Sequence, residues 1–211
     1  MLEINKYSAK GKEVGKIELP AALFAAEAKN PRALLYEVIK MYRANQRQGT
    51  SSVKNRAAIT GSTKKLFKQK GTGNARPGDI KTPLRVGGGM AFGPQPHDWY
   101  KKIPKKKKRL ALKLALSAKA AEGEVIVVES FDLEEPNTKF ARELIEKLIT
   151  EKKRALVLVD SSAPAIVRSF SNLPYVSMNR ADSTFAYEVL NAGTLIITED
   201  ALEKMVEVFA K

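Results

Sequence analysis

One stretch of the chain, residues 43–109, constrains the fold more than any other. It contains 18 Lys or Arg residues and two acidic residues, Asp79 and Asp98, so its formal charge is +16. The remaining residues have 19 basic and 21 acidic side chains, so the whole excess of +14 comes from this basic segment. Nine of the 13 glycines also lie there. Such a segment repels itself and buries too little apolar surface to fold alone.

The basic segment therefore needs a polyanion, and nucleic acid is the polyanion best able to neutralise so long a run of cations. Phe67, Phe92, Trp99 and Tyr100 are interleaved with Lys and Arg. Aromatic rings stack on unpaired bases while cations hold phosphates, which favours a nucleic-acid-binding function. For Trp99 and Tyr100, near the returning helix, an alternative remains open, in which they anchor the base of the loop to the folded domain.

We expect the phosphate contacts to come from the cations of the basic segment. They are Arg43, Arg47, Lys54, Arg56, Lys64, Lys65, Lys68, Lys70, Arg76, Lys81, Arg85, Lys101, Lys102, Lys105, Lys106, Lys107, Lys108 and Arg109. The last five open a predicted helix, where cations oppose the helix dipole. This local cost indicates that they face phosphate; a solvated charged turn is the alternative.

The rest of the chain predicts an α/β fold. Apolar runs at 125–128, 155–159, 175–178 and 194–198 alternate with helical patterns, which is typical of parallel strands buried on both faces. Residues 2–7 and 14–19 read as a hairpin at a sheet edge. We therefore predict a small, mostly parallel sheet with helices on both faces, a Rossmann-like three-layer arrangement.

Two parts of the chain follow from this pattern. Residues 1–48 and 105–211 are predicted to form the globular α/β domain, with a first helix that runs from Pro31, capped by Asn30, to the Gln48-Gly49 stop. Residues 49–104 show neither helical nor strand periodicity and have frequent Gly and Pro. We predict that they form an extended RNA-binding loop inserted into that domain.

Catalytic chemistry has little support in the sequence. There is no cysteine and one histidine, His97, which disfavours a metal site or a catalytic triad, and no strand is followed by a Gly-rich cofactor motif. Asp160 lies at a strand end, but Ser161 or Ser162 is better interpreted as the cap of a helix near Pro164. We expect no catalytic residues, no metal and no cofactor.

Composition is also compatible with one localisation. The lack of cysteine suits a reducing cytosol, the N-terminal residues show no secretory signal, and no apolar run is long enough to span a membrane.

Two other function classes remain open at this point. One is an RNA-modifying enzyme with a nucleotide cofactor, and the other is a free regulatory RNA-binding protein.

A family resemblance covers essentially the whole chain. The run KQKGTGNARPGDIKTPLRVGGGMAFGPQP, followed by a Tyr, a basic cluster and an Ala/Leu-rich helix, resembles the large-subunit ribosomal protein L4 family, bacterial type. The upstream RQGT at 47–50, the Lys54-x-Arg56 pair and the turn at 60–62 fit the same family.

The resemblance implies a structural, non-catalytic component of the cytoplasmic large ribosomal subunit. It implies a monomer that binds large-subunit ribosomal RNA, supports early assembly and has no membrane partner. It also implies contact with neighbouring ribosomal proteins, including the other tunnel-constriction protein, and repression of its own operon in some bacterial members.

The resemblance further implies that the loop tip lines the peptide exit tunnel, where it would meet the nascent peptide. The tip residues would be Phe67, Lys68, Gln69, Lys70, Gly71, Thr72, Gly73 and Asn74. The family usually has Trp-Arg where this chain has Phe67-Lys68, and Arg where it has Asn74. Lys lacks the planar fork of Arg, so individual tip contacts do not transfer directly.

Overall fold

The structure is a computed structural model that describes residues 3–131, 133, 135–149, 154–160 and 163–210. Two compact units make up the chain. The first, called here the α/β unit, consists of Met1–Arg43 and Lys102–Lys211, and the second, the inserted unit, consists of Ala44–Lys101.

The α/β unit contains a six-stranded sheet in the order β2-β1-β3-β6-β4-β5. Its strands are β1 (Glu3–Tyr7), β2 (Glu13–Glu18), β3 (Val125–Val128), β4 (Ala155–Val159), β5 (Val176–Arg180) and β6 (Thr194–Thr198). The β1–β2 hairpin is antiparallel and lies at one edge, while every other pairing is parallel. The predicted mostly parallel sheet with an edge hairpin is confirmed.

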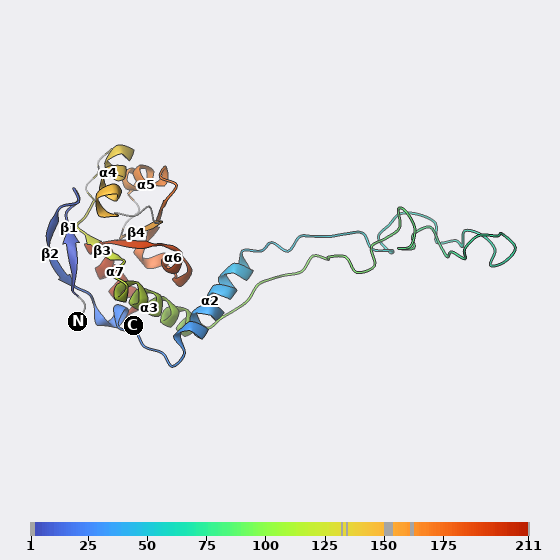
Figure 1. Ribbon diagram of the computed structural model, residues 1–211, viewed down its shortest axis with the longest axis horizontal. Coiled ribbons are helices and arrows are strands. Elements are labelled where there is room, and N and C mark those ends of the chain that lie inside the picture. Colours follow the sequence, from blue (N-terminus) through green and yellow to red (C-terminus); the bar gives the residue numbers. More distant parts are fainter. Residues whose placement is uncertain (1–2, 132, 134, 150–153, 161–162, 211) are drawn as a thin grey trace. The chain divides into compact units, whose positions relative to one another are not determined.

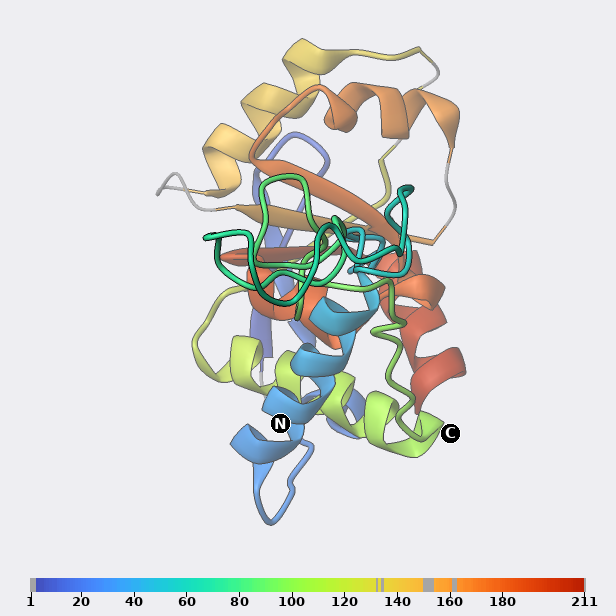
Figure 2. The same ribbon diagram turned by 90° about the vertical axis from the view of Figure 1, so that its right-hand side faces the viewer.

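Helices cover both faces of this sheet (Figures 1 and 2). They are α1 (Ala21–Phe24), α2 (Pro31–Asn45), α3 (Lys105–Ala121), α4 (Thr138–Leu148), α5 (Pro164–Ser171), α6 (Ala186–Asn191) and α7 (Glu199–Phe209), with a 3₁₀ turn, η1 (Ala181–Ser183). Side chains of α4 and α5 form the core on one face, and those of α1, α2, α3, α6 and α7 form the core on the other. The predicted three-layer α/β arrangement is therefore confirmed.

The central strand β4 explains why the apolar runs do not alternate with polar residues. All five of its residues are buried. Leu156 and Leu158 point into the core beneath α3 and α7, whereas Ala155, Val157 and Val159 point into the core beneath α4 and α5. A strand between two helical layers must be apolar on both sides.

Local signals in the sequence set several helix ends. The Asn137 side chain accepts a hydrogen bond from the Phe140 N–H at 3.0 Å and caps α4, as expected of an N-cap residue. Helix α3 ends at Ala121, and Gly123, just beyond its C-cap Glu122, has a φ of +71°. There the Glu124 N–H donates to the Lys119 carbonyl and the Gly123 N–H to the Ala120 carbonyl, the Schellman pattern that favours glycine.

Some of the predicted element ends differ from the structure, and others involve residues that the structure does not describe. Helix α2 ends at Asn45 rather than at the predicted Gln48-Gly49 stop. Helix α5 begins at Pro164, as predicted, and Ala163 occupies its N-cap position. Ser161 and Ser162 themselves, like Leu2 of the first predicted strand, lie outside the described residues.

Candidate nucleic-acid interface

The inserted unit contains no helix or strand beyond the last residues of α2, and scattered backbone hydrogen bonds hold its two arms together. The His97 N–H donates to the Gly49 carbonyl, the Val53 N–H to the Pro94 carbonyl and the Met90 N–H to the Lys54 carbonyl, at 3.0–3.1 Å. Farther along, the Leu66 N–H donates to Gly78. The outgoing and returning arms are thus paired at intervals without forming a regular ladder.

Asn45 joins the two arms where they begin and end. Its side-chain amide donates to the Lys101 carbonyl at 3.2 Å, and its side-chain oxygen accepts from the Lys101 N–H at 2.8 Å. This contact joins residues 56 positions apart and ties the last residue of α2 to the returning arm.

Trp99 is stacked within the inserted unit. The Arg47 guanidinium carbon lies 3.4 Å from the centroid of the indole ring, and the His97 ring centroid lies 4.3 Å from it. A guanidinium over an indole is a favourable cation–π contact. Trp99 therefore has partners in its own segment, while Tyr100 and Phe92 remain exposed.

Asp79 organises the middle of the inserted unit, a role that the sequence analysis missed. Its side chain is only 3% exposed, accepts from the Thr82 hydroxyl at 2.7 Å and pairs with the Arg56 guanidinium at 2.9 Å. The hydrogen bond from Thr82 and the Arg56 charge hold the pKa of this carboxyl below its ordinary value. An acid among 18 cations was itself a signal of an internal ion pair.

Glycine permits close backbone approach at the same place. A Cβ atom on Gly89 would lie 2.4 Å from the Arg56 backbone nitrogen, and one on Gly88 would lie 1.9 Å from the Thr82 carbonyl oxygen. No side chain fits at either distance. Gly89 therefore lets the returning arm pack directly on the backbone that carries Arg56, and Gly88 lets that arm turn back on the Thr82 carbonyl.

The 18 predicted phosphate-binding cations are almost all on the surface. Sixteen are exposed, and Lys81 and Lys108 are half-buried. Only Arg56, with Asp79, and Lys107, with Glu37 at 3.0 Å, pair with a carboxylate among the described residues. The remaining side chains are available to an external polyanion.

The predicted tip residues are also accessible. Seven of them, residues 68–74, are exposed and Phe67 is half-buried. Gly71 and Gly73 have φ values of +86° and +69°, a conformation that glycine adopts at little cost. The Lys65 ammonium donates a hydrogen bond to the Gln69 side-chain oxygen. Gln69 is neutral, and Lys65 forms no ion pair with a carboxylate among the described residues.

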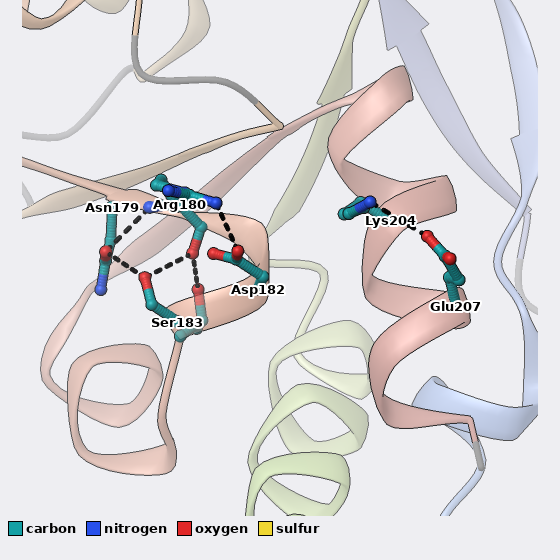
Figure 3. Close-up of polar contacts among 7 residues, drawn as sticks. Asn179, Arg180, Asp182, Ser183, Lys204 and Glu207 are labelled. Carbon is teal, nitrogen blue, oxygen red and sulfur yellow. Dashed lines mark hydrogen bonds and ion pairs between the residues drawn. The ribbon is translucent and has the colours of Figure 1, made fainter.

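The carboxyl end of the parallel sheet is where α/β enzymes commonly bind ligands, and here several polar groups after β5 bond to one another. In Figure 3 the Asn179 side chain accepts from the Arg180 N–H and from the Ser183 hydroxyl, and the Arg180 guanidinium pairs with Asp182. These contacts tie β5 to η1. They stabilise the turn that follows β5.

Two further observations limit the chemistry. Within the described ranges, no group of three or more His, Cys, Asp or Glu side chains is placed to hold a metal ion. No helix in those ranges has both the length and the apolar character needed to cross a membrane.

Comparison with known proteins points in one direction. Residues 17–208 match the model of the Ribosomal protein L4/L1 family. The chain is 43% identical over 208 residues to the "Large ribosomal subunit protein uL4" of Symbiobacterium thermophilum, covering 99% of both chains. It is 41% and 39% identical to the proteins of the same name from Alkaliphilus oremlandii and Natranaerobius thermophilus, over 99–100% of each chain.

Proposed function

The chain belongs to the Ribosomal protein L4/L1 family, and on that premise we propose how it works in the large ribosomal subunit. It is a structural component that binds large-subunit ribosomal RNA and has no catalytic role. The inserted unit and the first turn of α3 supply the phosphate contacts, and the α/β unit is the folded body that carries them.

One observation carries this proposal: sixteen of the eighteen cations in the basic segment are exposed. Each phosphate that a cation neutralises releases a counterion, which is a favourable and salt-dependent contribution to binding. The stacked Arg47–Trp99 pair and the buried Asp79 hold the arms in register. Exposed Phe92 and Tyr100 add rings on which unpaired bases can stack.

The test is a salt titration of binding to large-subunit ribosomal RNA transcript. We expect log K to fall linearly with log salt, by about 0.7–0.9 for each phosphate neutralised, so that ten contacts give a slope of about −7 to −9. Co-sedimentation of the protein with large subunits is the companion measurement. A slope near zero, or a protein that stays in the supernatant, would contradict the proposal.

We propose in addition that residues 67–74 line the peptide exit tunnel beside another ribosomal protein. The exposure of residues 68–74 supports this. A photoreactive benzoylphenylalanine in place of Lys70 should cross-link to a stalled nascent chain. The same group in place of Tyr36, which is exposed on α2 of the α/β unit, is the control. Equal cross-linking at both positions, or none at Lys70, would argue against a tunnel position.

Early assembly and autoregulation belong to the same proposal. A segment held by so few internal hydrogen bonds has to be in place before RNA folds around it, which supports early binding. Repression of its own operon would use the same cations on a messenger RNA. Competition between the leader of that messenger and ribosomal RNA for the protein is the measurement, and simultaneous binding of both would refute a shared site.

A further inference from the structure

The inserted unit contains a cavity of about 480 Å³ that the function described above does not use. It lies between the stretch before the tip and the stretch after it. Its lining consists of Ile59, Thr60, Gly61, Ser62, Lys64, Lys65, Leu66, Ile80, Val86 and Gly87. Cavities of this size lie within the range that takes a small planar ligand.

Part of the cavity wall consists of accessible apolar side chains, those of Ile59, Leu66, Ile80 and Val86. Ile80 is about half exposed, Leu66 slightly less, and Val86 is fully exposed. A Cβ atom on Gly61 would lie 3.3 Å from the Ile80 side chain, so the absence of a side chain at Gly61 lets Ile80 rest against the backbone. Apolar side chains gain free energy when a ligand removes them from water.

The rim of the same cavity is cationic. Lys64 and Lys65 both line it, and both are exposed. Neither pairs with a carboxylate among the described residues. The Lys65 ammonium bonds instead to the side chain of Gln69, which is neutral. The Ser62 hydroxyl accepts a hydrogen bond from the Lys64 N–H at 3.1 Å, which fixes the backbone from which these lysines extend. The site therefore combines an apolar floor with two positive charges at its edge.

We propose that this cavity binds one unstacked nucleobase of the ribosomal RNA. The base lies against Ile59, Leu66, Ile80 and Val86, while Lys64 and Lys65 hold the phosphates on either side of it. This inference rests on the proposed RNA-binding function and adds a salt-independent contact to it. A nucleotide is the ligand whose parts match the site, since it joins a flat, weakly polar ring to anionic groups a few ångströms away.

A peptide side chain is the competing occupant, and charge argues against it. An apolar side chain would fill the floor but would leave both lysines facing each other without an anion. The surrounding segment carries +16, which attracts RNA and repels other cationic ribosomal proteins. The cavity is thus better matched to RNA than to protein.

The test compares three variants of the full-length protein. Val86→Ser alone and Ile80→Ser with Val86→Ser remove apolar walls of the cavity. Leu84→Ser is the matched control, because Leu84 is almost fully exposed in the same stretch but does not line the cavity. Val86 has no buried contacts to lose, so its substitution does not threaten the fold.

Two probes separate the inference from the proposed function. Large-subunit ribosomal RNA transcript has bases, and heparin is a polyanion without them. We expect the double variant to bind the RNA about tenfold more weakly than the unaltered protein, with an unchanged salt slope, and to bind heparin equally well. Leu84→Ser should match the unaltered protein on both probes.

Each other outcome has a definite meaning. If the unaltered protein fails to bind the RNA, the proposed function fails. If it binds while the double variant binds equally well, the RNA-binding function stands and the nucleobase site is wrong. Equal losses on RNA and heparin would also overturn the site, since they would show a damaged segment rather than a lost base contact.

A cross-link identifies the occupant directly. Benzoylphenylalanine in place of Val86, in assembled large subunits, should stop reverse transcriptase at one unpaired nucleotide. Cross-linking to a ribosomal protein or to the nascent chain instead would assign the cavity to a peptide and overturn the proposal.

Discussion

Glu188 is a half-buried carboxyl on α6 whose charge is poorly solvated. Burial raises its pKa above the ordinary value, and the hydrogen bond that the Asn179 side chain donates to it at 2.6 Å only partly opposes this. The Tyr42 hydroxyl, whose own pKa is raised by burial and by the Glu188 charge, belongs to the same environment.

Linkage gives the sign of the resulting pH dependence. Between the ordinary and the raised pKa, the folded protein binds a proton at Glu188 that the unfolded chain has released. The free energy of unfolding therefore falls as pH rises through that window. Glu188→Gln should remove this fall and make the protein more stable than the unaltered chain above the window, in urea unfolding at a series of pH values.

The control for this experiment is Glu203→Gln, which removes the same charge from an exposed position on α7. In this variant the free energy of unfolding should still fall as pH rises through that window. If Glu188→Gln keeps the pH dependence of the unaltered protein, the burial of this carboxyl has no energetic consequence.

Gly89 and Gly78 provide a matched pair of substitutions in the inserted unit. A Cβ on Gly89 would meet the Arg56 backbone at 2.4 Å, whereas one on Gly78 would meet only the Thr82 hydroxyl at 3.9 Å. Overpacking of this kind costs about 1–3 kcal/mol, or about five- to 150-fold in affinity. Gly89→Ala should weaken binding to ribosomal RNA by a factor in that range, and Gly78→Ala should not, in filter-binding measurements. Equal affinity of both variants would show that the Arg56 contact is absent from the complex.

At the scale of elements, α3 combines a first turn whose charges oppose the helix dipole with later turns that are stabilised by burial. Its first turn has Lys105 and Lys106, no acidic residue and no side-chain cap at Pro104. Its later turns are buried, among them Leu112 and Leu116. The buried face stabilises the helix, so the first turn is free to carry charges that the helix dipole disfavours.

Lys105→Gln with Lys106→Gln should therefore change stability and binding in opposite directions. Stability should rise by a few tenths of a kcal/mol per residue, about 0.3 or more at low salt. RNA affinity should fall, and the salt slope should become shallower by about 0.7–0.9 per lysine. Lys139→Gln, in the first turn of α4, is the control and should raise stability without affecting RNA binding. An unchanged salt slope in the double variant would place these lysines in solvent.

The elements of the α/β unit were predictable because their signals are local. The apolar runs of β4 and β6 are both fully buried strands, and their positions follow from composition over five residues. The end of α2 was not predictable in this way. The Asn45 side chain there bonds to the Lys101 backbone, and nothing near Asn45 in the sequence indicates a partner so distant.

In the candidate interface, too, the features that depend on single residues could be predicted, whereas those that depend on contacts between distant residues could not. Charge and exposure of the cations could be anticipated residue by residue, since an unpaired Lys or Arg is costly to bury. The Asp79–Arg56–Thr82 contact and the cavity beside Ile80 could not. Both bring together stretches about 20 residues apart without a helix or strand to fix their spacing.

At the scale of the whole molecule, the two units differ in what stabilises them. The α/β unit has two continuous apolar cores and a hydrogen-bonded sheet. The inserted unit has scattered backbone hydrogen bonds, an ion pair between the buried Asp79 and the exposed Arg56, and many exposed cations that repel one another. Local opening free energies follow burial and hydrogen bonding, so the protein free in solution should have one stable unit and one weakly protected unit.

Amide hydrogen exchange tests this difference in one experiment. In the free protein, peptides from residues 50–103 should exchange almost as fast as unstructured peptide, because their backbone groups are mostly open to water. Peptides that contain β4 and β6 should stay protected in the same sample and serve as the internal control. On binding large-subunit ribosomal RNA, protection should appear across residues 50–103, since RNA neutralises the charges that oppose ordering. Strong protection of these residues without RNA would mean that the segment folds alone. It would contradict the prediction that the segment becomes ordered only when RNA neutralises its charges.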